Sequence, residues 1–340
     1  MQVAKYYGAH DIRIEEMPVP EPGPGEILMR IRASGICGSD VMHWYRAGRG
    51  PLVLGHEVAG EVAVVGTGVE KFKPGDRIAA AHHVPCNTCH YCLNGHHTVC
   101  DTLRSTNFYP GGFAGFVRLP VINVDRGVFP LPDAMSFEEA TFIEPLACVY
   151  RGQRIAGTKP GQSVLVIGSG IAGLLHIQLA KTLGASFVAG TDINRYRLEA
   201  AAGLGADVTV PAEDDVPEIF KKLNKGRPAD LVILTSGAEG AIKQAFRAVD
   251  RGGTILFFAP AGKGATVPLP INDLFWRNEI TLTSSYAANY QEHVIAMEFI
   301  RQNKVNVNAM ITHRFPLAET AKGFQLVEQA GDSLKVIIEP

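Results

Sequence analysis

The sequence lacks the features that direct a chain into a membrane or onto nucleic acid. It contains no run of 18 apolar residues, and residues 1–7 show no charged head followed by an apolar core. Lysine and arginine number 32 against 34 aspartate and glutamate residues, and no long basic run occurs. We therefore expect no membrane span, no signal peptide, no nucleic-acid partner and a cytoplasmic location.

Internal repeats and low-complexity segments are also missing, which excludes solenoid and fibrous architectures. What is present is typical of a soluble globular protein, with 46% hydrophobic and 19% charged residues. A length of 340 residues exceeds one ordinary hydrophobic core and predicts two domains. Without an export signal, the six cysteines are expected to be reduced ligands rather than three disulfides.

Four of the cysteines form one run with the spacing C-x2-C-x2-C-x7-C: Cys86, Cys89, Cys92 and Cys100. Four thiolates so close in sequence can close a tetrahedron around zinc and leave no open position, which is typical of a structural site. Histidines crowd the same segment, and we expect them to be solvated loop residues because the thiolates already fill the shell. These are His82, His83, His90, His96 and His97.

A fifth cysteine, Cys37, lies upstream of this run, and His56 and Glu57 follow it nineteen residues later. A thiolate, an imidazole and a carboxylate from distant loops can bind zinc and still leave a position for water or substrate. This second group therefore predicts a catalytic zinc site.

The two halves of the chain differ in pattern. Residues 1–145 are rich in glycine and proline with short apolar runs, which predicts a β-rich, barrel-like domain. From about residue 150, apolar strands alternate with helical segments, which is typical of βαβ units and a parallel sheet. The strands and helix expected there are 164–167, 187–190, 231–234, 254–258 and the helix 171–183.

A glycine-rich turn joins the first of these strands to the helix. Its context fits dinucleotide binding, because glycines let a pyrophosphate approach the helix N-terminus. Asp192 ends the next strand, where a carboxylate can bind a ribose hydroxyl and repel a 2′-phosphate, so NAD is favoured over NADP. Arg195 and Arg197 follow it and weaken that preference, since arginine can accept a phosphate. The predicted cofactor-binding residues are Gly168, Gly170, Ile171, Ala172, Gly173, Asp192 and Arg197.

The segment Gly55-His56-Glu57 continues through Gly60 and Gly66 to Val69 and matches the pattern G-H-E-x2-G-x5-G-x2-V. In this it resembles the zinc-containing medium-chain alcohol dehydrogenases over the whole chain. The resemblance implies an α/β fold with a GroES-like β-rich catalytic domain, residues 1–146 and 286–340, carrying a zinc lobe at about 82–104. Residues 147–285 would form a Rossmann NAD-binding domain with a doubly wound parallel sheet.

Within that superfamily the chain is similar to the sorbitol (polyol) and threonine dehydrogenase branch, because Glu144 stands where alcohol dehydrogenases carry a third ligating cysteine. The resemblance implies that Cys37 and His56 bind the catalytic zinc with Glu57 or Glu144 and water. Ser39 matches the hydroxyl that takes the alcohol proton. The relay histidine of the family would fall at Met42, and the histidine comes one residue later, at His43.

The implied activity is oxidation of a secondary alcohol, such as a polyol or sugar alcohol, by NAD⁺ with two zinc ions per chain. Sorbitol dehydrogenases carry an arginine–tyrosine pair near the equivalent of Ala287 and Ala288, which puts sorbitol itself in doubt. The alternatives are oxidation of a β-hydroxy amino acid, a zinc-free enone or quinone reductase, and a zinc ribbon without activity. The resemblance also implies a homodimer or homotetramer. Cleft residues expected by position are Trp44, Tyr45, Phe113, Tyr286 and Asn289.

Overall fold

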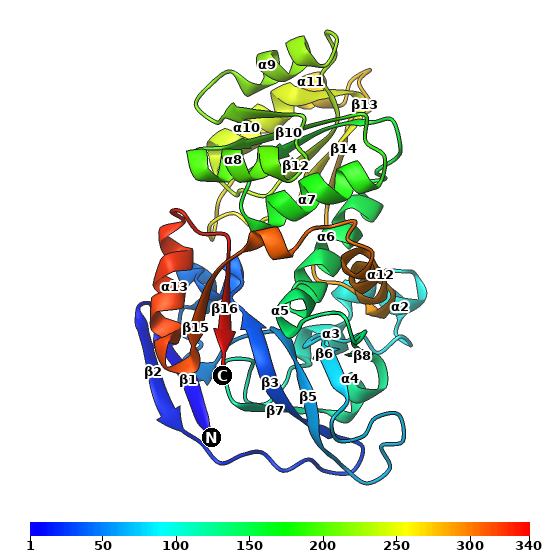
Figure 1. Cartoon of the computed structure of the whole chain (residues 1–340). Coiled ribbons are helices and arrows are strands. Elements are labelled where there is room, and N and C mark those ends of the chain that lie inside the picture. The colour runs from blue at the N-terminus through cyan, green and yellow to red at the C-terminus, as the bar shows by residue number, and fades with distance from the viewer. The chain divides into compact units, whose positions relative to one another are not determined.

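The computed structural model describes all 340 residues, which form two compact units. The first unit comprises Met1–Ala147, Ala287–Gln302 and Val307–Pro340, and the second comprises Cys148–Tyr286 and Asn303–Asn306. Figure 1 follows the chain through both units by colour. No helix has the length and apolar character needed to cross a lipid bilayer.

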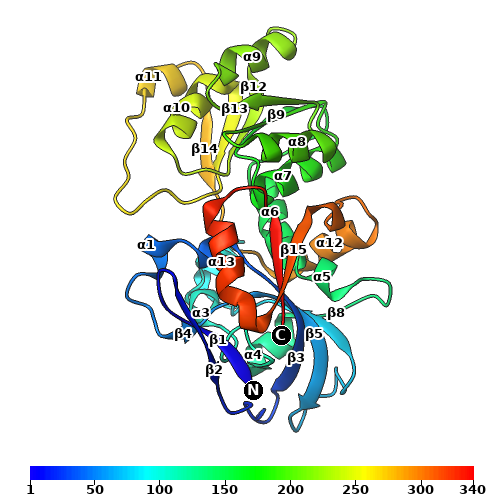
Figure 2. The same ribbon diagram turned by 60° about the vertical axis from the view of Figure 1, so that its left-hand side comes forward.

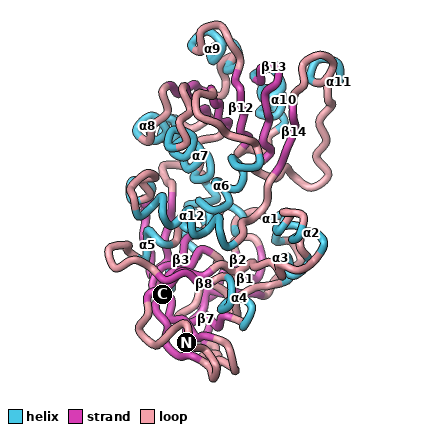
Figure 3. Tube along the Cα trace, turned by 90° about the vertical axis from the view of Figure 1, so that its right-hand side faces the viewer, coloured by secondary structure: helices cyan, strands magenta, loops and turns pink.

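The first unit is built around a seven-stranded sheet in the order β15-β16-β3-β5-β6-β8, with β7 also paired to β3. Figure 3 shows these strands in magenta, joined mostly by loops. This confirms the β-rich GroES-like expectation for the first part of the chain. The strands are β3 (Ile27–Gly35), β5 (Glu57–Val65), β6 (Arg77–Ala80), β7 (Phe116–Leu119), β8 (Val128–Pro130), β15 (Ile311–Pro316) and β16 (Lys335–Glu339).

Strand β3 shows why this sheet forms. Its first residues, 27–29, are all buried. From Met29 onward the buried Met29 and Ile31 flank the exposed Arg30, which is the alternation of a strand with one face in the core. The buried side chains pack with those of β5, β6 and β7 in one apolar cluster. Strand β3 therefore lies at the centre of the first unit. The segment that begins at Ile36 follows it directly.

A smaller sheet in the order β2-β1-β4 completes the first unit, and its apolar face packs on helix α13. The strands are β1 (Gln2–Gly8), β2 (Asp11–Glu16) and β4 (Leu52–Val53). The helices of this unit, with α6 continuing into the second, are α1 (His43–Arg46), α2 (His90–Leu93), α3 (Asp101–Ser105), α4 (Val121–Arg126), α5 (Phe137–Ala140), α6 (Ile143–Ile155), α12 (Tyr290–Arg301) and α13 (Thr320–Gln329), with the 3₁₀ turns η1 (Gly38–Asp40), η2 (His97–Val99), η3 (Asn308–Met310) and η4 (Leu317–Glu319).

The second unit contains one six-stranded parallel sheet in the order β11-β10-β9-β12-β13-β14. The order reverses beside β9, which is the topology of a doubly wound Rossmann sheet. The strands are β9 (Ser163–Ile167), β10 (Phe187–Asp192), β11 (Val208–Pro211), β12 (Ala229–Leu234), β13 (Val249–Phe257) and β14 (Thr281–Ser284).

Helices cover both faces of this sheet. Helices α7 (Ile171–Thr182) and α8 (Arg195–Gly203) pack together on one face, and α9 (Val216–Leu223) and α10 (Glu239–Ala248) pack together on the other (Figure 2). A short helix, α11 (Ile271–Leu274), precedes the edge strand. Because both faces are covered, every residue of β9 is buried, which explains its uninterrupted apolar sequence.

Candidate active site and zinc centres

Cys37 stands at the end of β3, where the chain turns into η1. Its backbone N–H donates to Asp40 Oδ2 at 3.1 Å, and its Sγ accepts from the Ser39 N–H at 3.4 Å. These two bonds close a capping box around the turn and fix the direction of the thiol.

His56 and Glu57 enter the same site from the start of β5. The ligand atoms of Cys37, His56 and Glu57 lie within 4.8 Å of one another. The carboxylate of Glu57 is 1% exposed and accepts a bond from the equally buried Nζ of Lys335 on β16, which also donates to Ile36 O at 3.4 Å. Lys335 thus holds the Glu57 carboxylate through its Oε2.

Asp40 is the buried carboxylate behind His56. Its Oδ1 lies 3.6 Å from His56 Nδ1 and accepts a bond from Arg46 Nη2 at 3.1 Å. Burial disfavours a charged His56 ring, but Asp40 and the Cys37 thiol outweigh it and raise the pKa of His56 well above its usual value. The surroundings therefore favour a cation. A soft thiolate, an imidazole with a carboxylate behind its ring, and a second carboxylate are a donor set that fits zinc.

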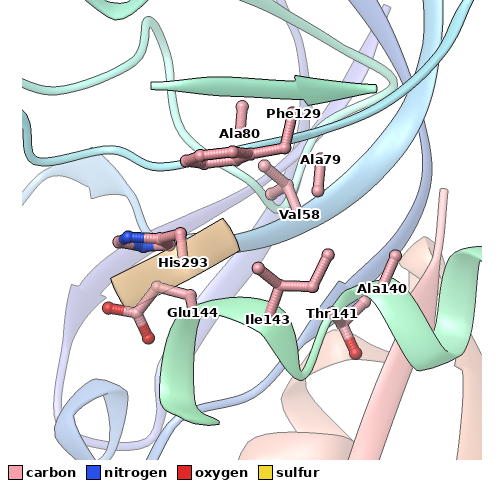
Figure 4. Close-up of a pocket in the computed structure, with 9 residues that line it drawn as sticks. All are labelled: Val58, Ala79, Ala80, Phe129, Ala140, Thr141, Ile143, Glu144 and His293. Carbon is pink, nitrogen blue, oxygen red and sulfur yellow. The ribbon is translucent and has the colours of Figure 1, made fainter. Parts of the chain in front are cut away.

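Glu144 lies beside this group on α6 and lines a cavity of about 10 Å³ with His293 of α12 (Figure 4). Glu144 contributes to the field that raises the pKa of His56. His293 is buried and stacks on Phe129, with ring centroids 5.1 Å apart, and its Nδ1 donates to Asn289 O at 2.7 Å. The His293 Nε2 has no partner and is therefore a free acceptor next to the site.

The structure corrects two sequence-based expectations here. His82 is not a solvated loop residue, because its ring is half-buried and its centroid lies 4.8 Å from that of His56 and 3.8 Å from that of His83. Burial and the neighbouring histidines lower the pKa of His82 well below its usual value, so the ring stays neutral. Phe113 does not line a cleft, because it is fully buried against Phe324 in the core of the smaller sheet.

Ser39 lies beside Cys37 in the structure, whereas the His43 side chain contacts Glu328. Ser39 belongs to η1 and is tied to the site by its N–H bond to Cys37 Sγ and by its carbonyl, which accepts from Arg46 Nε at 3.0 Å. His43 opens α1, and its Nε2 pairs with Glu328 Oε1 at 2.5 Å. The imidazole expected to relay a proton is thus engaged with a carboxylate of α13.

The cysteine run folds as a lobe with α2, η2 and α3, of which Figure 3 labels the two α-helices. Its four cysteines form no disulfide. The Sγ separations are 3.6 Å for Cys89–Cys92, 3.6 Å for Cys86–Cys100 and 4.0 Å for Cys86–Cys92. Sulfurs bound to tetrahedral zinc at about 2.3 Å lie about 3.8 Å apart. The spacing is therefore compatible with a structural zinc and far too long for a disulfide.

The thiols of this lobe also differ in acidity. Backbone N–H bonds from Thr88 and Cys89 lower the pKa of Cys86 to about 5, whereas burial raises the pKa of Cys92 to about 12. A buried cluster of thiolates is costly unless a cation balances the charge. The donor set thus fits a divalent metal.

The glycine-rich turn follows β9 in the second unit and opens α7. Gly168 has a φ of 100°, which favours glycine, and a Cβ on Gly173 would lie only 1.9 Å from Gly168 O. A Cβ on Gly170, by contrast, would meet nothing closer than Arg197 Nη1 at 3.8 Å. The turn therefore leaves open space at the N-terminus of α7, where a pyrophosphate can bind.

Asp192 closes this turn from the end of β10. Its Oδ2 accepts from the Ser169 N–H at 2.7 Å, and its Oδ1 accepts from the Asn194 N–H at 2.9 Å. Each oxygen keeps a further lone pair for a ribose hydroxyl. Arg195 is 91% exposed and pairs with Glu199, so Arg197 is the arginine beside the turn.

Comparison with known proteins decides the family. Residues 23–133 match the alcohol dehydrogenase GroES-like domain, and residues 172–302 match the zinc-binding dehydrogenase domain. Sorbitol dehydrogenase of Gallus gallus is 32% identical over 342 residues, which cover 97% of this chain and 94% of that protein. The chain belongs to the zinc-binding alcohol dehydrogenase family. It is therefore an enzyme, an oxidoreductase of the medium-chain type.

Solved structures agree with this assignment. A zinc-binding dehydrogenase of Sinorhizobium meliloti bound to NADP has a TM-score of 0.89 at 28% identity, covering 100% of this chain and 99% of that one. An Escherichia coli alcohol dehydrogenase complexed with NADH also has a TM-score of 0.89, at 25% identity and with the same coverage. The family assignment and the fold expected from the sequence are confirmed.

Proposed function

We propose that the chain is a zinc-dependent polyol dehydrogenase that oxidises a secondary alcohol with NAD⁺. The observation that carries the proposal is the convergence of Cys37, His56 and Glu57 on one point, with Asp40 behind the imidazole. A sheet with a dinucleotide-type glycine turn in the same chain supplies the place for the cofactor. The similarity to sorbitol dehydrogenases supports a polyol over a β-hydroxy amino acid or an enone.

In this proposal Cys37, His56 and Glu57 hold the catalytic zinc. Bound there, zinc acts as a Lewis acid that lowers the pKa of an alcohol hydroxyl or polarises a ketone. Asp40 orients the His56 ring, and Lys335 holds the Glu57 carboxylate in place. Glu144 adds negative charge beside the site without belonging to the tight group of ligand atoms.

Ser39 is the proposed proton acceptor. Its hydroxyl is two residues from the Cys37 thiol, and two hydrogen bonds of its backbone hold it beside that ligand. The Ser39 Oγ would accept the proton of the substrate hydroxyl and donate its own proton to water, while the nicotinamide, when bound, would accept the hydride. We leave His43 out of this path because its Nε2 is already paired with Glu328.

The substrate is proposed to be a polyol other than sorbitol. Ala287 packs against the cysteine cluster and Ala288 is 2% exposed. Neither position offers a polar side chain to a long sugar alcohol, whereas the resemblance to sorbitol dehydrogenases implies an arginine–tyrosine pair near these positions in them. A shorter or differently hydroxylated polyol fits this composition better.

A substrate screen tests the proposal. NAD⁺ reduction is measured over polyols, simple secondary alcohols and β-hydroxy amino acids, with the Cys37→Ala variant as control. We expect the highest kcat/KM on a polyol and no turnover in the variant. Highest activity on L-threonine, or equal turnover in the control, would overturn the proposal.

We also propose that the enzyme is a homodimer, or a tetramer built from such dimers, paired through β14. This strand ends the Rossmann sheet, and its outer backbone groups have no partner strand in the chain. The segment before it exposes the large apolar side chains of Ile271 and Trp276 at 58% and 69%. An isologous contact would cover both features. Light scattering that gives 36.6 kDa, the mass of one chain, would contradict it.

We propose a cytoplasmic location because the cysteines are in the reduced form. None of the six forms a disulfide, and the ligand atoms of the four in the lobe lie within 4.8 Å of one another. Such thiols keep their metal-binding form only in a reducing compartment. Fractionation of the source cells that recovers the activity outside the cytoplasm would contradict this location.

A further inference from the structure

A third group of metal-ligating side chains lies outside both zinc centres. It consists of His10, His43 and Glu328, which come from three distant segments of the first unit. His10 occupies the turn between β1 and β2, His43 opens α1, and Glu328 belongs to the last turn of α13. Figure 2 shows the β1–β2 hairpin beside α13, and the two elements pack together.

The Glu328 carboxylate bridges the two imidazoles. Its Oε1 lies 2.5 Å from His43 Nε2, and its Oε2 lies 3.2 Å from His10 Nδ1. One ligand atom from each residue lies within 4.8 Å of the other two. Atoms bound to tetrahedral zinc at about 2.0–2.1 Å are about 3.3 Å apart. The spacing from His10 Nδ1 to Oε2 already has this value. His43 Nε2 contacts the other oxygen, Oε1, in a hydrogen bond that a metal would replace by opening it by about 0.8 Å, so both carboxylate oxygens would face the cation.

We propose that His10, His43 and Glu328 form a third metal site, for zinc or a similar transition cation such as cobalt or nickel. Two imidazoles and one carboxylate suit these borderline cations, whereas magnesium and calcium require mainly oxygen ligands. The three side chains leave a coordination position for water. No residue of this group belongs to the cysteine lobe or to the Cys37 group, so the site is additional to them.

The site is exchangeable, unlike the two resident centres. The side chain of His10 is 70% exposed and that of His43 is 40% exposed, so a cation can enter directly from solvent. His43 Nδ1 is buried without a partner. The other ring nitrogen of a resident zinc ligand is normally hydrogen-bonded, and losing such a bond weakens metal affinity about 10–100-fold. The occupancy of this site would therefore rise and fall with the free zinc concentration.

Occupancy has a mechanical consequence within the first unit. One cation would link the β1–β2 turn, the start of α1 and the end of α13, in addition to the Glu328 contacts and the edge contact of the His10 and His43 rings, whose centroids lie 5.1 Å apart. A ligand that binds only the folded state raises the melting temperature as its concentration rises. Zinc added beyond the two resident ions should therefore stabilise the protein.

Cobalt and zinc titrations of the enzyme that already holds two zinc ions test the proposal. The variants are Glu328→Gln, which keeps the side-chain shape, and His10→Asn, because His10 has a φ of 61° and asparagine tolerates that conformation. The control is Glu319→Gln, which removes a carboxylate paired with Lys322 elsewhere on the C-terminal segment. Metal analysis of each protein first establishes that both resident zinc ions are retained.

We expect the wild type and the Glu319→Gln control to bind one further equivalent by calorimetry, with a rise in melting temperature. Both test variants should weaken this binding at least tenfold and lose the zinc-dependent rise. No further equivalent at millimolar free zinc would show that the group is an ordinary surface ion pair. Equal affinity in all four proteins would place the additional metal elsewhere, and either result overturns the proposal.

Discussion

Replacing Lys335 with methionine tests how the active site is held together. Lys335 and Glu57 form a fully buried ion pair, and each side chain is 1% exposed. Methionine fills a similar volume without the charge, so the substitution leaves the Glu57 carboxylate buried beside Cys37 and His56 without the ammonium group that binds its Oε2. The perturbation thus isolates the charge rather than the packing.

Removing one partner of a buried ion pair typically lowers the free energy of unfolding by about 3–5 kcal/mol, because the other charge stays desolvated and unpaired. For a unit of 150–250 residues, each kcal/mol lowers the melting temperature by about 2–4 °C, so the expected loss is about 6–20 °C. Zinc at Cys37, His56 and Glu57 would compensate part of the charge. The loss should therefore be larger in metal-free protein than in the zinc-loaded enzyme.

The assay is thermal unfolding of wild type and Lys335→Met with and without zinc, with Lys322→Met as the matched control. Lys322 pairs with Glu319 at the surface, and such pairs contribute about 0–1 kcal/mol. The double variant Glu57→Gln/Lys335→Met should recover much of the stability, because it removes both charges. A Lys335→Met loss no larger than that of the control, in both metal states, would refute the reasoning.

Three further predictions concern the lobe and the cofactor. Cys92→Ser should lose one zinc and melt at a lower temperature while NADH still binds; full zinc content with unchanged melting would contradict a structural site. Gly173→Ala should abolish NADH binding measured by fluorescence, because its Cβ would lie 1.9 Å from Gly168 O, whereas Gly203→Ala, with open space around it, should bind normally. Asp192 should give NAD⁺ a kcat/KM about 10- to 100-fold above that for NADP⁺; equal values would indicate that Arg197 decides the preference.

Most of the fold could be predicted from the sequence pattern, which changes from short apolar runs in the first part of the chain to alternating strand and helix segments in the second. The proline-rich segment 18–24 contains no helix or strand, and the apolar segment at 163–167 is the central strand β9, because backbone chemistry and burial act locally at both places. Strand β14 lies at the sheet edge, as its position at the end of the strand–helix series indicates. Such features depend on residues that are close in sequence.

The site was harder to predict because its supporting residues are distant in sequence. Lys335 reaches Glu57 from the last strand, and His293 joins Glu144 from α12. Neither residue has a motif of its own, and only the register of β16 with β3 places the lysine. His82 was expected in solvent because the four thiolates already fill the zinc shell, but it follows the strand β6 and packs on His56. The sequence feature that could have indicated the burial of His82 is the apolar strand immediately before it.

The central claim is that Cys37, His56 and Glu57 hold a catalytic zinc separate from the zinc of the cysteine lobe. The most direct test is metal content and NAD⁺-dependent alcohol oxidation measured on the same preparation of Cys37→Ala. We predict one zinc in place of two, no turnover, and NADH binding and melting close to those of the wild type. A Cys37→Ala preparation that lacks one zinc and still oxidises its alcohol would contradict the account.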